Sequence, residues 1–166
     1  MKKLFLMGRS EAGKTSLTQV LKGEELHYEK TQYTKTWDTY AIDTPGEYAE
    51  NKNVGVALGC FSFEADVIAI LMAADEPYSV FEASCQSFVT RPLIGIITKI
   101  DSPNANVPMV RQWLINSGCY EIFPINNVTG EGVDALIEYL NKTPRRITLE
   151  EAKERQRNGL PEWDDE

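Results

Sequence analysis

The sequence has 166 residues, the length of one ordinary domain, with 25 acidic against 17 basic side chains and a formal net charge of -8. This charge argues against a surface dedicated to nucleic acid or anionic membrane, because both are bound mainly through Lys and Arg. The widely spaced Cys60, Cys85 and Cys119, together with the lack of a leader or a long apolar run, favour a reduced, soluble, cytoplasmic protein.

The first predicted strand, residues 3–7, leads directly into the sequence GRSEAGKT at residues 8–15 and then into a helical pattern at 14–22 that ends at Gly23. The spacing GxxxxGK[ST] is that of a phosphate-binding loop, in which backbone N–H groups and a helix N-terminus face a polyphosphate. We expect Lys14, as a solvent-side loop residue, to contact the β- and γ-phosphates and the Thr15 hydroxyl to ligate Mg²⁺. The predicted phosphate-binding residues are Gly8, Arg9, Ser10, Glu11, Ala12, Gly13, Lys14, Thr15 and Ser16.

Residues 24–35 are polar and aromatic without periodicity, which predicts an exposed loop. Two strands at 34–37 and 40–43 follow, and the second ends in the sequence Asp43-Thr44-Pro45-Gly46. A carboxylate at the end of a strand beside a phosphate loop can hold Mg²⁺ through a water, so Asp43 is a candidate metal ligand. The N–H of Gly46 is then free to meet a γ-phosphate.

The second half of the chain continues this alternation of strands and helices. The patterns predict a partly helical segment at 47–59, strands at 66–72, 92–98 and 120–125, mostly loop at 77–91, and helices at 107–116 and 133–140. We expect the apolar side chains of Val110, Trp113 and Leu114 to face inward. The alternation predicts an α/β fold with a doubly wound, mostly parallel sheet and helices on both faces, formed by residues 1–141.

Three segments, 8–15, 43–46 and 98–101, stand in the order, spacing and strand-end positions of the small GTPase domain, which they resemble. In that family the Asp that matches Asp101 accepts hydrogen bonds from the guanine N1–H and exocyclic amine, and the Lys that matches Lys99 packs along the base. The resemblance therefore implies a P-loop GTPase-like domain that binds GTP or GDP with Mg²⁺. The base-side residues that it implies are Thr98, Lys99, Asp101, Asn126, Asn127 and Val128.

A more specific resemblance rests on residues 23–32 and 42–48, which are similar to the EutP/PduV family. Its members are small proteins encoded with ethanolamine or propanediol utilisation functions, which operate with bacterial microcompartments. This similarity implies a microcompartment association, with a shell or cargo protein as partner. It also makes Thr31 the candidate switch threonine that senses Mg²⁺ and the γ-phosphate, with Thr34 as the alternative.

Several residues depart from the GTPase pattern. Glu47 follows Gly46 where Ras-like enzymes carry a Gln that orients the attacking water, so we expect slow hydrolysis, with Lys14, Gly46 and Glu47 as the catalytic candidates. Glu11 replaces the Asn of potassium-activated GTPases. Asn126-Asn127 replaces the usual Ser-Ala pair, although the Asn127 backbone N–H can still meet the guanine carbonyl.

Two other functions stay open beside a GTPase or GTP-dependent switch. One is a phosphotransferase that moves phosphate between a nucleotide and a small carboxylate such as acetate, for which Arg9 and Arg91 are the candidate cations. The other is a binding module in which the nucleotide only orders the switch loops. The charged tail, residues 142–166, has a capping-box sequence at Thr148 to Glu151 that predicts a short helix, and it is either a solvated end or a docking segment.

Overall fold

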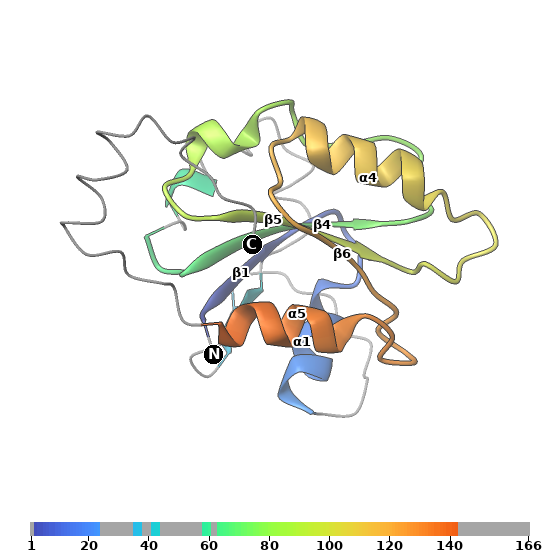
Figure 1. The fold of residues 1–166 in the computed structure, drawn as a ribbon, viewed down its shortest axis with the longest axis horizontal. Helices are drawn as coiled ribbons and strands as arrows, with labels where there is room; N and C mark the ends of the chain where they lie inside the picture. The colour runs from blue at the N-terminus through green and yellow to red at the C-terminus, as the bar shows by residue number, and fades with distance from the viewer. Residues whose placement is uncertain (1, 24–34, 38–40, 44–57, 61–62, 143–166) are drawn as a thin grey trace, which may run out of the picture.

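The computed structural model describes residues 2–23, 35–37, 41–43, 58–60 and 63–142. Six strands form one sheet in the spatial order β2-β3-β1-β4-β5-β6 (Figure 1). All neighbouring strands run parallel except β2 and β3, which are antiparallel. The strands are β1 (Leu4–Met7), β2 (Lys35–Trp37), β3 (Ala41–Asp43), β4 (Val67–Ala73), β5 (Leu93–Thr98) and β6 (Ile122–Pro124).

Helices cover both faces of the sheet. Helices α1 (Lys14–Lys22) and α5 (Val133–Asn141) lie on one face, and α4 (Val107–Asn116) and the short 3₁₀ helix η1 (Cys85–Phe88) lie on the other (Figure 1). The side chains of strand β1 alternate between the two layers, because successive residues of a strand point to opposite faces. This arrangement confirms the predicted α/β fold with a doubly wound, mostly parallel sheet.

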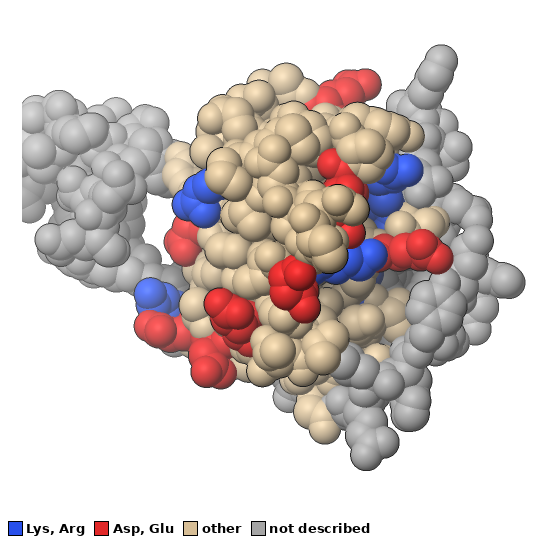
Figure 2. Space-filling view, turned by 90° about the vertical axis from the view of Figure 1, so that its right-hand side faces the viewer, with Lys and Arg blue, Asp and Glu red and all other residues tan. Residues whose placement is uncertain are grey.

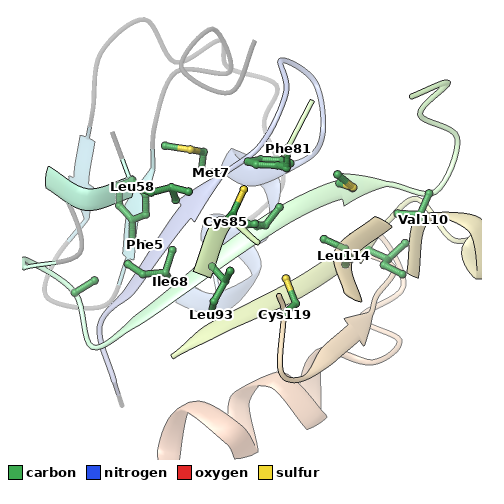
Figure 3. Close-up of a cluster of buried hydrophobic side chains, with 14 of the residues drawn as sticks. Phe5, Met7, Leu58, Ile68, Phe81, Cys85, Leu93, Val110, Leu114 and Cys119 are labelled. Atoms are coloured by element: carbon green, nitrogen blue, oxygen red, sulfur yellow. The ribbon is translucent and has the colours of Figure 1, made fainter. Parts of the chain in front are cut away.

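Two hydrophobic clusters fill the space between the sheet and its helices. The cluster under α4 and η1 includes Phe5, Met7, Ile68, Cys85, Leu93, Val110, Leu114 and Cys119 (Figure 3). The cluster under α1 and α5 includes Leu4, Leu6, Leu17, Val67, Leu71, Ile94, Leu136 and Leu140. Strands β1, β4 and β5 contribute to both clusters, which explains why their sequences are apolar throughout rather than alternating.

Most of the predicted elements are confirmed. Helices 14–22 and 107–116 have the predicted bounds, and the last helix extends by one residue to Asn141. The last strand is shorter than the predicted range 120–125, because it pairs with β5 only from Ile122 to Pro124. Residues 77–91 contain only the short helix η1. Residues 58–60 are helical, and the rest of the predicted segment 47–59 lies outside the described residues.

Strand β1 lies inside the sheet, and its two neighbours β3 and β4 both follow it in the chain. The order of strands therefore reverses at β1, and ligands of open α/β sheets bind beside the carboxyl ends of strands at such a point. These carboxyl ends lie on the right in Figure 1. Across the described part of the chain, every helix is too short or too polar to cross a membrane.

Candidate nucleotide-binding site

The loop between β1 and α1 is shaped by two glycines. A Cβ on Gly8 would overlap the carbonyl oxygen of Leu71 on strand β4, so only glycine fits where the chain leaves β1. Gly13 has φ 99°, in the left-handed region that glycine adopts without strain, and forms the N-cap of α1. Between them, the N–H of Ala12 donates to the Arg9 carbonyl at 3.2 Å, which closes the loop on itself.

The first turn of α1 is suited to an anion. The N-cap, Gly13, has no side chain to cap the helix, and the first turn contains no acidic residue. The backbone N–H groups at a helix start carry the positive end of the helix dipole, which attracts an anion, and no negative side chain of this turn offsets it. This helix start therefore has the properties of a phosphate-binding site.

Lys14 lies at the start of this helix, with only 6% of its surface exposed. Its ammonium group donates hydrogen bonds to the carbonyl oxygens of Gly8 and Arg9, both at 2.7 Å. The expectation that Lys14 is a solvent-side loop residue is therefore wrong, because the loop folds around its side chain. The two hydrogen bonds hold the positive charge inside the loop, where it also stabilises the loop in the absence of phosphate.

The end of β5 contacts the phosphate loop through Thr98, the last residue of the strand, which is fully buried and donates its hydroxyl to the Ala12 carbonyl at 2.5 Å. Lys99 follows with φ 52°, a backbone conformation that residues other than glycine rarely adopt and that recurs at functional sites. Ser102 ties the loop to the end of β4, donating its hydroxyl to Asp75 at 2.9 Å. Lys99 and Asp101 are left exposed, so both side chains are accessible to a ligand.

The loop after β6 is built around Asn126, whose side-chain oxygen accepts hydrogen bonds from the Val128 and Thr129 N–H groups at 2.9 and 3.2 Å. Asn127 turns the other way, and its Nδ2 donates to the Gly13 carbonyl at 3.2 Å. Val128 is 79% exposed. Of the predicted base-side residues, the structure thus places Asn127 and Thr98 in contact with the phosphate loop.

Sequence reasoning missed a cluster at the end of β4. Glu76 is 8% exposed, and its Oε1 accepts a hydrogen bond from the Ala73 N–H at 3.0 Å. Burial raises the pKa of the Glu76 carboxyl, and the positive charges of Arg9 and Lys14 oppose that rise. The Arg9 guanidinium stacks 4.8 Å from the centre of the Tyr78 ring. The sequence signal for Glu76 is the one that made Asp43 a candidate, an acidic residue close to the end of a buried strand. The same rule could therefore have identified Glu76.

The oxygen donors proposed for Mg²⁺ come from neighbouring elements. Thr15 lies in the first turn of α1, and Asp43 ends β3 in register with Leu6 of β1, at the same edge of the sheet. Hydroxyl and carboxylate oxygens are the donors that Mg²⁺ prefers, so this donor set fits the ion. Among the described residues no further group of acidic, His or Cys side chains could hold a metal. Thr31, Thr34, Gly46 and Glu47 lie outside the described residues.

The edge that carries these loops faces the viewer in Figure 2, where scattered basic side chains lie among more numerous acidic ones on the described surface. Arg91, a candidate cation for phosphoryl transfer, precedes β5 and therefore lies at the amino end of that strand. Because β1 and β5 run in the same direction, this is the edge opposite the phosphate loop. The nomination of Arg91 is wrong for this reason.

A glycine-containing loop at the reversal of strand order, flanked by polar loops at the ends of β5 and β6, is the arrangement of a P-loop GTPase-like protein. A family model described as "Ethanolamine utilisation - propanediol utilisation" (PduV-EutP) matches residues 1–142. The chain belongs to this family, which confirms the resemblance in its sequence.

Two relatives carry the names of this family, and a GTPase is similar at lower identity. The chain is 43% identical over 143 residues to the propanediol utilization protein PduV of Citrobacter freundii, covering 85% of this chain and 94% of that protein. It is 32% identical over 142 residues to the Escherichia coli K12 protein named probable acetate kinase EutP, covering 84% and 89%. GTPase Era of Corynebacterium diphtheriae is 26% identical over 163 residues, covering 84% of this chain and 53% of Era.

A solved structure supports the fold. The structure of Methanosarcina barkeri Roco2 RocCORdC bound to GDP matches with a TM-score of 0.54 and 20% identity, covering 83% of this chain and 47% of that one. At this identity the similarity concerns the arrangement of the elements alone.

Proposed function

We propose that the protein binds guanine nucleotide together with Mg²⁺ and acts as a slow GTPase or GTP-dependent switch. The observation that carries this proposal is the contact between the phosphate loop and the start of the predicted base-side loop: Thr98, the last residue of β5, donates its hydroxyl to the Ala12 carbonyl. A single ligand with a polyphosphate at one end and a base at the other fits this pair of loops. The accessible carboxylate of Asp101 supplies the acceptor that a guanine needs.

The predicted roles follow the chemistry of the residues. Lys14 transfers its hydrogen bonds from the loop carbonyls to the β- and γ-phosphates. Thr15 and Asp43 would hold Mg²⁺, whose positive charge would neutralise negative charge on the phosphate oxygens. Thr31 is the proposed switch threonine and Thr34 its alternative. A carboxylate at Glu47 would face the developing charge of the γ-phosphate, so intrinsic turnover is slow.

The test is incubation of the protein with labelled GTP or ATP and Mg²⁺, with and without acetate, followed by measurement of inorganic phosphate and acetyl phosphate. Phosphate release from GTP supports a GTPase, and GTP binding without turnover supports a switch. Lys14→Ala is the matched control, because it removes the ammonium group and leaves the helix start in place. Unchanged GTP affinity in a folded Lys14→Ala protein would reject the proposed site.

Formation of acetyl phosphate would favour the phosphotransferase, the alternative that the sequence leaves open. The described residues give this alternative less support than GTP binding. Of its two candidate cations, Arg91 lies at the opposite edge, and the guanidinium of Arg9 stacks on Tyr78.

The cellular setting is proposed from the family. Membership in an ethanolamine and propanediol utilisation family supports a cytoplasmic protein that associates with bacterial microcompartments through a shell or cargo protein. We assign nucleotide binding to residues 1–141 and propose that the charged segment 142–166, of which residues 143–166 lie outside the described residues, is a separate docking tail.

A further inference from the structure

Asn127 lies at the contact between the loop after β6 and the phosphate loop. Its Nδ2 donates to the Gly13 carbonyl at 3.2 Å, and the same carbonyl accepts the Leu17 N–H of helix α1 at 2.9 Å. Because a carbonyl can only accept, the amide of Asn127 is fixed with its nitrogen toward Gly13. Its Oδ1 is then turned into the protein, where it is buried and has no partner among the described residues.

The side chain of Asn127 is not needed to shape its own loop. Asn126 does this, because its Oδ1 accepts two backbone N–H groups and its carbonyl accepts the Gly130 N–H at 2.9 Å. The Asn127 amide makes one hydrogen bond, to the phosphate loop, and its oxygen remains unsatisfied. A buried unsatisfied acceptor carries a free-energy cost, so the contact with Gly13 is the feature that accounts for an amide at this position.

A second contact of the same kind lies next to it. Thr98 donates its hydroxyl to the Ala12 carbonyl, so two successive carbonyls of the phosphate loop accept hydrogen bonds from side chains at the end of β5 and in the loop after β6. These side chains meet at Gly13, where an added Cβ would lie 3.0 Å from the Asn127 Nδ2 and 3.5 Å from the Thr98 methyl group. The absence of a side chain at Gly13 therefore allows both loops to approach.

We propose that Asn127 is a positioning residue whose side chain holds the loop after β6 against the phosphate loop, so that base recognition and phosphate binding reinforce each other. This inference rests on the proposed binding of guanine nucleotide. A loop that is already in place needs no ordering when the base enters, which improves affinity for the whole nucleotide. A ligand that consists of phosphates alone does not use this loop and gains nothing from the contact.

The experiment compares the affinities of wild type, Asn127→Ala and Asn127→Asp for GTP and for inorganic tripolyphosphate, with Mg²⁺ present. Loss of one hydrogen bond predicts a fall in GTP affinity of roughly tenfold for Asn127→Ala, with tripolyphosphate affinity unchanged within about twofold. Asn127→Asp keeps the size of the side chain but places an oxygen against the Gly13 carbonyl, so its loss is at least as large. Glu131→Ala, which changes an exposed side chain in the same loop, is the control and leaves both affinities unchanged.

Hydrogen exchange on the nucleotide-free proteins provides a second readout. Faster exchange of the backbone N–H groups of residues 126–130 in Asn127→Ala, with an unchanged melting temperature, supports the inference. Equal losses of GTP and tripolyphosphate affinity, or no loss of either, would overturn it while leaving GTP binding by the wild type in place. Failure of the wild type to bind GTP would instead reject the proposed function and the inference with it.

Discussion

Glu76 places a carboxylate close to the two positive charges of the phosphate loop. Burial raises the pKa of its carboxyl above the ordinary value of 4.5, partly offset by the Ala73 N–H and by Arg9 and Lys14, while Asp75 raises it further. The folded protein therefore holds this proton more tightly than the unfolded chain. The contribution of Glu76 to the free energy of unfolding is unfavourable above the raised pKa and disappears as the pH falls below 4.5.

Glu76→Gln is predicted to increase the free energy of unfolding at pH 7, because it removes a buried charge and keeps an oxygen for the Ala73 N–H. The advantage should shrink as the pH is lowered through the raised pKa and vanish below 4.5, where the wild-type carboxyl is protonated in both states. Urea unfolding of both proteins between pH 4 and pH 8 measures this difference. A constant difference across that range would contradict the assigned burial of the charge.

The exposed carboxylate of Asp101 decides the choice of base in the proposed function. Guanine offers it two donors, whereas adenine leaves a charged acceptor unsatisfied, so GTP should be preferred over ATP by roughly a hundredfold. Asp101→Asn exchanges one acceptor oxygen for a donor, which suits the C2 carbonyl of xanthine. The variant should lose affinity for GTP and gain affinity for xanthosine triphosphate.

Titration of wild type and Asp101→Asn with GTP, ATP and xanthosine triphosphate checks this exchange of specificity. Equal binding of GTP and ATP by the wild type would remove the base-side argument and favour an ATP-dependent phosphotransferase.

At the level of elements, the start of α5 is constrained by two glycines that differ in their surroundings. Gly132 and Gly130 have φ of 77° and 81°, so a side chain at either position is strained. A Cβ on Gly132 would also overlap the carbonyl of Pro124, whereas nothing lies within 4 Å of a Cβ on Gly130. An alanine at Gly130 therefore introduces backbone strain alone, whereas an alanine at Gly132 introduces both strain and steric overlap.

Gly130→Ala is predicted to lower the free energy of unfolding by about 1 kcal/mol, the cost of the left-handed conformation alone. Gly132→Ala should cost at least about twice as much, because the end of β6 or the start of α5 must also move. Chemical denaturation of both variants gives the comparison. Equal losses would mean that the Pro124 carbonyl adapts without cost.

The elements could be predicted from the sequence because their signals are local. The apolar runs of β4 and β5, the periodicity of α1 and α4, and the glycine at the end of α1 each depend on adjacent residues. The phosphate loop could be predicted equally well, because its motif stands in the sequence between a strand pattern and a helix pattern. The end of β6 was less predictable, since the extent of pairing depends on β5 rather than on its own sequence.

The contacts between loops could not be predicted in this way. The hydrogen bond from Asn127 to Gly13, and the burial of Glu76 near Arg9 and Lys14, join residues that are distant in the chain. The sequence shows that Asn127 and Glu76 are present, but it does not show which neighbours their side chains contact. The proposed switch residues, Thr31, Gly46 and Glu47, keep the status of predictions.

At the scale of the whole molecule, the proposed nucleotide site and the end of α5, where the tail begins, lie at opposite edges of the sheet. Helix α5 ends beside the start of β1, where the Lys2 N–H donates to the Leu140 carbonyl at 2.9 Å. The phosphate loop begins at the other end of β1 (Figure 1). Nothing in the described fold therefore connects residue 142 directly with the phosphate loop.

Removal of residues 143–166 is accordingly predicted to leave the affinity for GTP unchanged within about twofold, while abolishing any binding to a microcompartment protein that the tail mediates. Nucleotide titration of the full and shortened chains, with co-sedimentation against purified shells, measures the two effects separately. A large loss of GTP affinity in the shortened chain would show that the tail belongs to the nucleotide-binding domain.

The two side chains that hold the phosphate loop have a consequence for synthesis of the protein. The loop is among the first segments to leave the ribosome, but the side-chain hydrogen bonds to its Ala12 and Gly13 carbonyls come from residues 86 and 114 positions later in the chain. At roughly 5–20 residues per second, the loop waits on the order of ten seconds for the second of them. A nascent chain arrested before residue 127 should therefore retain little nucleotide, so nucleotide capture would mark the completion of translation rather than assist its early stages.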